Sequence, residues 1–128
     1  MIVSDTHAFF WWLAGSSELS PRGRDLLERN DVVVVPAIVL WEIAMLAAKG
    51  RIILGVETTE YLERATTLPR VRVEPLSPRI AVRANAFGDT LHRDPADRLI
   101  VATAMELSAP LITKDAHIQA FGGVETVW

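Results

Sequence analysis

Short apolar runs alternate with segments of helical pattern along the whole chain, and this alternation restricts the fold more than any other feature. We expect β-strands at Ile2–Ser4, Val32–Val35, Val71–Glu74, Pro110–Thr113 and Val124–Val127. The segments between them predict helices over residues 6–14, 21–29, 37–49, 59–68, 78–87 and 95–107, with a short helix after residue 115. This order predicts an α/β fold: one three-layer α/β/α domain, residues 1–128, around a mostly parallel, twisted sheet.

Composition excludes several classes of site. The 128 residues contain no cysteine, which rules out disulfides, thiolate metal sites and cysteine nucleophiles. A net charge of −3 argues against a large basic surface that coats nucleic acid, although an acidic metal pocket would itself lower the charge.

No membrane or export segment is expected either. Asp5 and His7 interrupt the start of the chain before any apolar core of a signal peptide develops. The longest apolar run, Val32 to Ala48, has 17 residues and carries Glu42, whereas a membrane helix needs about 20 apolar residues. We therefore expect a cytoplasmic protein.

Glu42 is the most informative single residue. It is the only charge between Val32 and Ala48, and its helical neighbours are apolar. An ionised carboxylate buried without a partner costs several kcal/mol, so Glu42 should be paired, protonated or bound to a cation. The alternative is that Glu42 occupies one exposed stripe of its helix, although hardly any other polar residue marks such a stripe.

Two aspartates directly follow predicted strands, where a parallel α/β sheet binds its ligands. Asp5 follows the first strand, and Asp115 follows the fourth. Each has an alternative role as the N-cap of the next helix, because aspartate is a favoured capping residue. Thr113 is a candidate to cap in place of Asp115, or to form a hydrogen bond with a carboxylate of the site.

Asp94 and Asp97 lie in one helix start but differ in their expected roles. With Pro95 at the first helical position, Asp94 is the N-cap and Asp97 lies in the first turn. Both carboxylates are also suited to satisfying free amides and the helix dipole. Asp97, however, shares a helix face with apolar residues (Ile100, Val101 and Ala104), so we expect it to point inward as a ligand.

Together Asp5, Glu42, Asp97 and Asp115 form a predicted four-carboxylate site. Four acids held close together repel one another and would bind protons unless a divalent cation compensated them. Ligation by carboxylates alone suits Mg²⁺ or Mn²⁺ and does not suit zinc.

The chain resembles the PIN-domain family, specifically the VapC-like toxins of bacterial toxin–antitoxin pairs. The segments that carry the resemblance are Ile2–His7, Leu40–Ala44 with Lys49–Arg51, His92–Ile100 and Leu111–Asp115. They span essentially the whole chain, and the His-x-Asp-Pro-x-Asp-Arg pattern is fairly specific to one toxin-like subgroup. In such proteins the acids that match the four-carboxylate site bind metal.

The resemblance implies hydrolysis of RNA phosphodiester bonds, with a cognate antitoxin as protein partner. Arg93, Arg98 and Lys114 lie beside the acids and are candidates to hold flanking phosphates, or to pair with neighbouring carboxylates. His7 and His92 flank the acidic segments, but isolated histidines in such places are more often structural than catalytic.

One position departs from the subgroup. A serine is common three residues before the helical glutamate, where this chain has Val39. Its absence removes a hydroxyl that would support the metal ligands, and we expect weaker metal affinity as the consequence.

The predicted helix over residues 6–14 is apolar around its whole circumference. It contains Phe9, Phe10, Trp11, Trp12 and Leu13. A helix that covers a sheet needs one apolar stripe, so the opposite face requires another cover. We expect a protein interface there, either a homodimer contact or a groove for the antitoxin.

Three other functions are alternatives to that of a toxin. A signalling receiver domain has the same fold class but needs paired acids after its first strand, where this chain has Ser4 before a single Asp5. The other two are a non-catalytic metal- or RNA-binding module on the same fold, and a PIN-type nuclease that acts on DNA flaps or in RNA processing.

Overall fold

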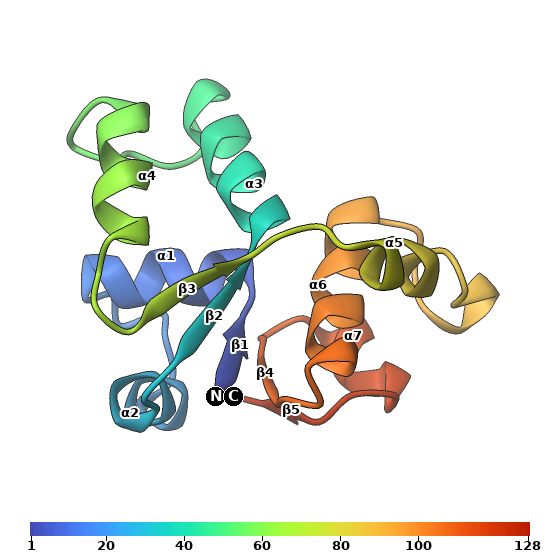
Figure 1. Ribbon diagram of the computed structural model, residues 1–128. Coiled ribbons are helices and arrows are strands. Elements are labelled where there is room, and N and C mark those ends of the chain that lie inside the picture. The colour runs from blue at the N-terminus through green and yellow to red at the C-terminus, as the bar shows by residue number, and fades with distance from the viewer.

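The computed structural model describes residues 1–128 and contains one five-stranded sheet. The strands are β1 (Ile2–Ser4), β2 (Val33–Pro36), β3 (Val71–Glu74), β4 (Leu111–Ile112) and β5 (Thr126–Val127). They are arranged in the order β3-β2-β1-β4-β5, and every neighbouring pair is parallel (Figure 1). The predicted α/β fold with a parallel sheet is therefore confirmed.

Helices connect the strands in chain order. They are α1 (Thr6–Ala14), α2 (Pro21–Arg29), α3 (Ala37–Ala48), α4 (Thr58–Thr66), α5 (Pro78–Ala84), α6 (Pro95–Glu106) and α7 (Ala116–Phe121), with a short 3₁₀ helix at Gly88–Thr90. No helix combines the length and the apolar character that a membrane crossing requires.

The helix starts follow the sequence signals. Ser20, Ser77 and Asp94 each accept a hydrogen bond from a backbone N–H in the first turn of their helix, with proline next in the chain. Helix α5 ends earlier than expected, at Ala84, because the Asn85 side chain donates to the Ala81 carbonyl at 2.8 Å and closes the last turn.

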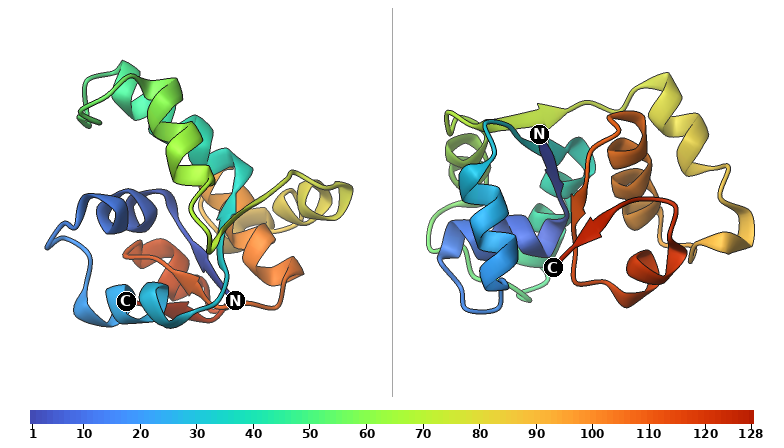
Figure 2. Two further views of the ribbon diagram at one scale, coloured as in Figure 1. Left: turned by 60° about the vertical axis from the view of Figure 1, so that its left-hand side comes forward. Right: turned by 90° about the horizontal axis from the view of Figure 1, so that it is seen from below.

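Alternate strand residues face opposite layers of the molecule. Val3, Val34 and Leu111 contribute to a large core with α3 and α6, whereas Ile2, Val33 and Ile112 pack with α2 and part of α1. This is the expected three-layer arrangement. Helices α3 and α4 extend together away from the sheet on the side where β1 and β2 end (Figures 1 and 2).

Candidate functional site

Asp5 stands at the junction of β1 and α1 and has two structural roles. Its Oδ1 accepts a hydrogen bond from the backbone N–H of Ala8 at 2.8 Å, which caps α1. Its half-buried carboxylate also lines a cavity at the end of β1. Burial raises the pKa of Asp5 to about 6, and hydrogen bonds from Thr113 and Ala8 offset part of this rise. The capping and site roles therefore coexist.

Glu42 reaches the same cavity from α3, which follows the neighbouring strand β2. It is half-buried, and the Thr6 hydroxyl at the start of α1 donates a hydrogen bond to its Oε1. Burial raises the pKa of Glu42, the Thr6 hydrogen bond lowers it, and Asp97 raises it further. The side chain is neither in the apolar core nor on an exposed stripe, but at the wall of an acidic cavity.

Asp97 points into this cavity from the first turn of α6, while Asp94 caps the helix. Asp94 Oδ1 accepts from the backbone N–H of Ala96 at 2.9 Å and from that of Asp97 at 3.4 Å. Asp97 Oδ2 lies 2.7 Å from His92 Nε2. Burial raises the pKa of Asp97, and the hydrogen bond with His92 opposes this effect. Asp94 is thus the cap, as expected, although both side chains line the cavity, and the ligand role of Asp97 stays a prediction.

Asp115 completes the set from the turn between β4 and α7. Its Oδ1 caps α7 by accepting from the backbone N–H groups of His117 at 2.8 Å and Ile118 at 3.0 Å. Thr113 is fully buried, and its hydroxyl accepts from the Asp115 N–H at 3.1 Å. Asp115 is therefore the cap, and Thr113 supports the turn that presents it.

These four carboxylates line one cavity of about 500 Å³, which we call the carboxylate pocket. Its remaining lining residues are Thr6, His7, Trp11, Asp94 and Lys114. Adjacent strands β1, β2 and β4 bring the acids together, because parallel strands end at the same edge of the sheet.

None of the four carboxylates in the carboxylate pocket forms an ion pair with a lysine or arginine. The pKa values of Asp5, Glu42 and Asp97 are all raised, by burial first and also by acidic neighbours. The one lysine of the lining, Lys114, is exposed, and its Nζ lies 3.8 Å from Glu18 and 5.7 Å from the Trp11 ring. Oxygen ligands with uncompensated negative charge fit Mg²⁺ or Mn²⁺.

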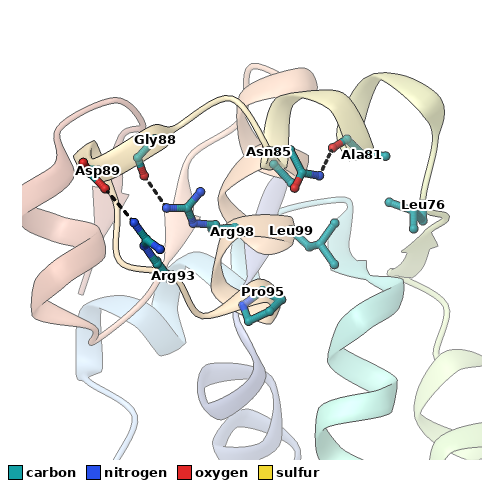
Figure 3. Close-up of a pocket in the computed structure, with 10 residues that line it drawn as sticks. Leu76, Ala81, Asn85, Gly88, Asp89, Arg93, Pro95, Arg98 and Leu99 are labelled. Carbon is teal, nitrogen blue, oxygen red and sulfur yellow. Dashed lines mark hydrogen bonds and ion pairs between the residues drawn. The ribbon is translucent and has the colours of Figure 1, made fainter.

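Arg93 and Arg98 lie outside the carboxylate pocket. They line a neighbouring cavity of about 520 Å³, shown in Figure 3. Arg98 donates to the backbone carbonyls of Gly88, Leu91 and His92, which fixes the loop before α6. Its guanidinium is thus engaged by backbone carbonyls and forms no ion pair with a carboxylate. Arg93 is exposed and pairs with Asp89 at 3.3 Å.

Two supporting contacts of the site were missed in the sequence. The sequence indicates Thr6 only as the first residue of a helix, whereas its hydroxyl donates to Glu42, 36 positions away along the chain. The sequence places His92 beside the acidic segment but does not indicate its pairing with Asp97. The available signal was the short spacing: Thr6 adjoins Asp5, and His92 precedes Asp97 by five residues.

The apolar circumference of α1 is covered in part by the chain itself. Phe9 is fully buried, Phe10 packs against Tyr61 of α4, and Trp11 packs edge-on against Trp128. Trp12 packs against Phe9 and beneath the Arg70 guanidinium. Phe10, Trp11, Trp12 and Leu13 nevertheless stay half-buried, so the protein interface expected at α1 stays a prediction.

Val39, which stands where the subgroup often has a serine, contributes to the packing of the core. Its side chain is completely buried in the large core with Ile43. The expected loss of metal affinity at this position stays a prediction.

Comparisons with known proteins agree with this geometry. The family model described as PIN domain matches residues 2–124. Ribonuclease VapC22 of Mycobacterium tuberculosis is 34% identical over 119 residues, which are 93% of this chain and 90% of that protein.

Solved structures with the same fold include toxins and their complexes. A toxin–antitoxin complex from Klebsiella pneumoniae contains a chain with a TM-score of 0.71 and 21% identity, covering 100% of this chain and 97% of that one. VapC20 of Mycobacterium tuberculosis, described as a toxin that cleaves the sarcin–ricin loop, has a TM-score of 0.71 and 21% identity, with 98% of each chain covered.

Proposed function

We propose, because this chain belongs to the PIN domain family, that it is a VapC-like ribonuclease and the toxin of a toxin–antitoxin pair. We further propose that the carboxylate pocket holds Mg²⁺ or Mn²⁺ and that this site hydrolyses RNA phosphodiester bonds. The observation that carries the proposal is the convergence of four carboxylates in one pocket, none of which pairs with a lysine or arginine.

The residues of the pocket fit a divalent cation and hold its ligands in place. Asp5 and Asp115 are fixed because each also caps a helix, and Glu42 is held by the Thr6 hydroxyl. His92 orients Asp97. When bound, a divalent cation polarises a phosphoryl oxygen and lowers the pKa of an attacking water.

Substrate binding also depends on charge compensation. The acids would repel the phosphodiester backbone of RNA at neutral pH if no cation were bound. Lys114 at the rim of the pocket, and Arg93 near it, are exposed and suited to hold flanking phosphates. No protein nucleophile is required, since the attacking group is water.

The protein partners follow from the relatives. The structural neighbour from Klebsiella pneumoniae is a toxin–antitoxin complex, which supports an antitoxin as partner of this chain. We propose that the chain acts in the cytoplasm, and a homodimer stays a prediction. Co-expression with the product of a small neighbouring reading frame should suppress RNA cleavage if that product is the antitoxin.

Cleavage of RNA by the purified chain tests the proposal. We expect cleavage with Mg²⁺ or Mn²⁺, none with a chelator, and a loss of about 100-fold or more in Asp5→Asn and Asp97→Asn. Asp25→Asn is the matched control, because Asp25 is an exposed acid that pairs with Arg29 on α2.

Equal rates in the wild type, Asp5→Asn and Asp97→Asn would overturn the catalytic role of the pocket. Metal binding without any cleavage would indicate a non-catalytic module. Cleavage of DNA flaps in preference to RNA would indicate another type of PIN nuclease.

A further inference from the structure

A second group of potential ligands adjoins the carboxylate pocket and contains two histidines that the proposed hydrolysis does not use as metal ligands. His92 lies in the loop before α6, and His117 lies in the first turn of α7, next to its cap Asp115. The two imidazole rings are 5.1 Å apart between centroids. One ligand atom from each of His92, Asp115 and His117 lies within 4.8 Å of the other two.

His92 is already oriented as metal-binding histidines usually are. Its Nε2 lies 2.7 Å from Asp97 Oδ2, and an ionised carboxylate only accepts, so Nε2 carries the hydrogen. Its Nδ1 is then an acceptor, and it is buried without any hydrogen-bond partner. Histidine ligands typically donate their other N–H to a carboxylate in this way.

The unpartnered nitrogen needs an explanation. A buried acceptor without a partner loses its hydrogen bonds to water and gains none in return, and native structures contain few such groups. A cation bound at Nδ1 would satisfy this lone pair. Nothing in the proposed hydrolysis uses it.

We propose that His92, Asp115 and His117, which we call the histidine cluster, bind a borderline divalent cation such as Zn²⁺. Two imidazoles and one carboxylate are a ligand set that zinc favours and that Mg²⁺ does not. Three protein ligands leave the fourth tetrahedral position open for water.

The ligand atoms of the histidine cluster must move closer together to bind zinc. Ligand atoms of a tetrahedral zinc site are about 3.4 Å apart, since zinc–ligand distances are about 2.0–2.2 Å. His117 is free to close this gap, because 79% of its side chain is exposed and Asp115 Oδ1 lies only 3.7 Å from its Nδ1.

The histidine cluster shares Asp115 with the carboxylate pocket, and His92 contacts Asp97. A cation in the histidine cluster would therefore compete with a cation in the carboxylate pocket for Asp115. Through His92 it would also hold Asp97 in place. We expect Zn²⁺ to inhibit Mg²⁺-dependent cleavage; this consequence rests on the proposed function, whereas the binding of Zn²⁺ does not.

Direct binding of Zn²⁺ and Co²⁺ to the untagged chain tests the histidine cluster. Calorimetry with Zn²⁺ should give one site per chain whose apparent affinity falls as Mg²⁺ is added, and Co²⁺ should give the visible absorption of a tetrahedral complex. His117→Gln should bind at least about 10-fold more weakly. His7→Gln is the matched control, because His7 is exposed and lines the carboxylate pocket outside the cluster.

Nitrogen-15 NMR of the histidine rings identifies the ligand atoms. We expect Zn²⁺ to shift the Nδ1 resonance of His92 and to leave His7 unchanged. The assignment is overturned if Zn²⁺ does not bind, if His117→Gln binds as tightly as the wild type, or if His92 is unaffected. Zinc binding without RNA cleavage would overturn the proposed function only, and cleavage without zinc binding would overturn the histidine cluster only.

Discussion

Asp5 is subject to opposing requirements, because it caps α1 and is also buried among acids. Burial raises its pKa from 3.8 to about 6. Between these two pH values the folded chain binds more protons than the unfolded chain, so the stability of the metal-free protein falls as pH rises through this window. Protonation therefore favours the folded state in acid, and the proposed cation would take over that role at neutral pH.

Replacement of Asp5 by Asn should remove this pH dependence. Asn keeps the N-cap and cannot ionise, so without divalent metal Asp5→Asn should be the more stable protein at pH 7, by at most about 3 kcal/mol. The advantage should shrink towards pH 4. Denaturant unfolding at several pH values measures it, and a difference that does not vary with pH would contradict the assigned pKa.

Thr6 should control the ionisation of Glu42 through its single hydroxyl. Thr6→Val keeps the shape of the buried side chain but removes the donor to Glu42, so the pKa of Glu42 should rise further and stability at pH 7 should fall by about 1–2 kcal/mol. Carbon-13 NMR of the Glu42 carboxyl group measures the pKa. Thr6→Ser should restore it, and equal titration in Thr6→Val and the wild type would exclude this role.

At the scale of secondary structure, the packing of α1 side chains against other parts of the chain contributes to the stability of the fold. Trp12 contacts Phe9 and the Arg70 guanidinium, whereas Trp41 on α3 is 58% exposed. We expect Trp12→Ala to lower the free energy of unfolding by about 3 kcal/mol and Trp41→Ala to change it by less than about 1 kcal/mol. Thermal unfolding of the isolated chain compares them, and equal losses would contradict intramolecular cover of α1.

The elements were predictable from the sequence because their signals are local. Capping residues followed by proline marked three helix starts, and β-branched runs such as Val33–Val35 marked buried strands. The separation of Asp94 from Asp97 also followed from helical periodicity. These features depend on spacings of a few residues.

Contacts between distant segments were not predictable in the same way. The bond from Thr6 to Glu42 and the packing of Phe10 on Tyr61 depend on how α1, α3 and α4 meet in space. Arg98 adjoins acids in the sequence, yet its guanidinium turns to three backbone carbonyls of the preceding loop. The sequence neighbours of a charged residue do not determine its partners.

At the scale of the whole molecule, metal binding should stabilise the fold. The acids come from the β1–α1 and β4–α7 junctions and from helices α3 and α6, so a cation that binds only the folded chain would link segments across its length. At a metal concentration 100 times Kd the gain is about 2.7 kcal/mol. Thermal unfolding with and without Mn²⁺ measures it. Asp97→Asn should lose most of the gain, Asp25→Asn should keep it, and equal gains in both would place the metal elsewhere.

The source of the oxygen in the cleaved phosphate tests the central claim most directly. RNA should be cleaved once by the wild-type chain with Mg²⁺ in isotopically labelled water, and the products analysed by mass spectrometry. Water activated at the carboxylate pocket predicts one labelled oxygen in a terminal phosphate monoester, and no product in Asp97→Asn. An unlabelled 2′,3′-cyclic phosphate, or the same products with a chelator present, would contradict hydrolysis at a metal site.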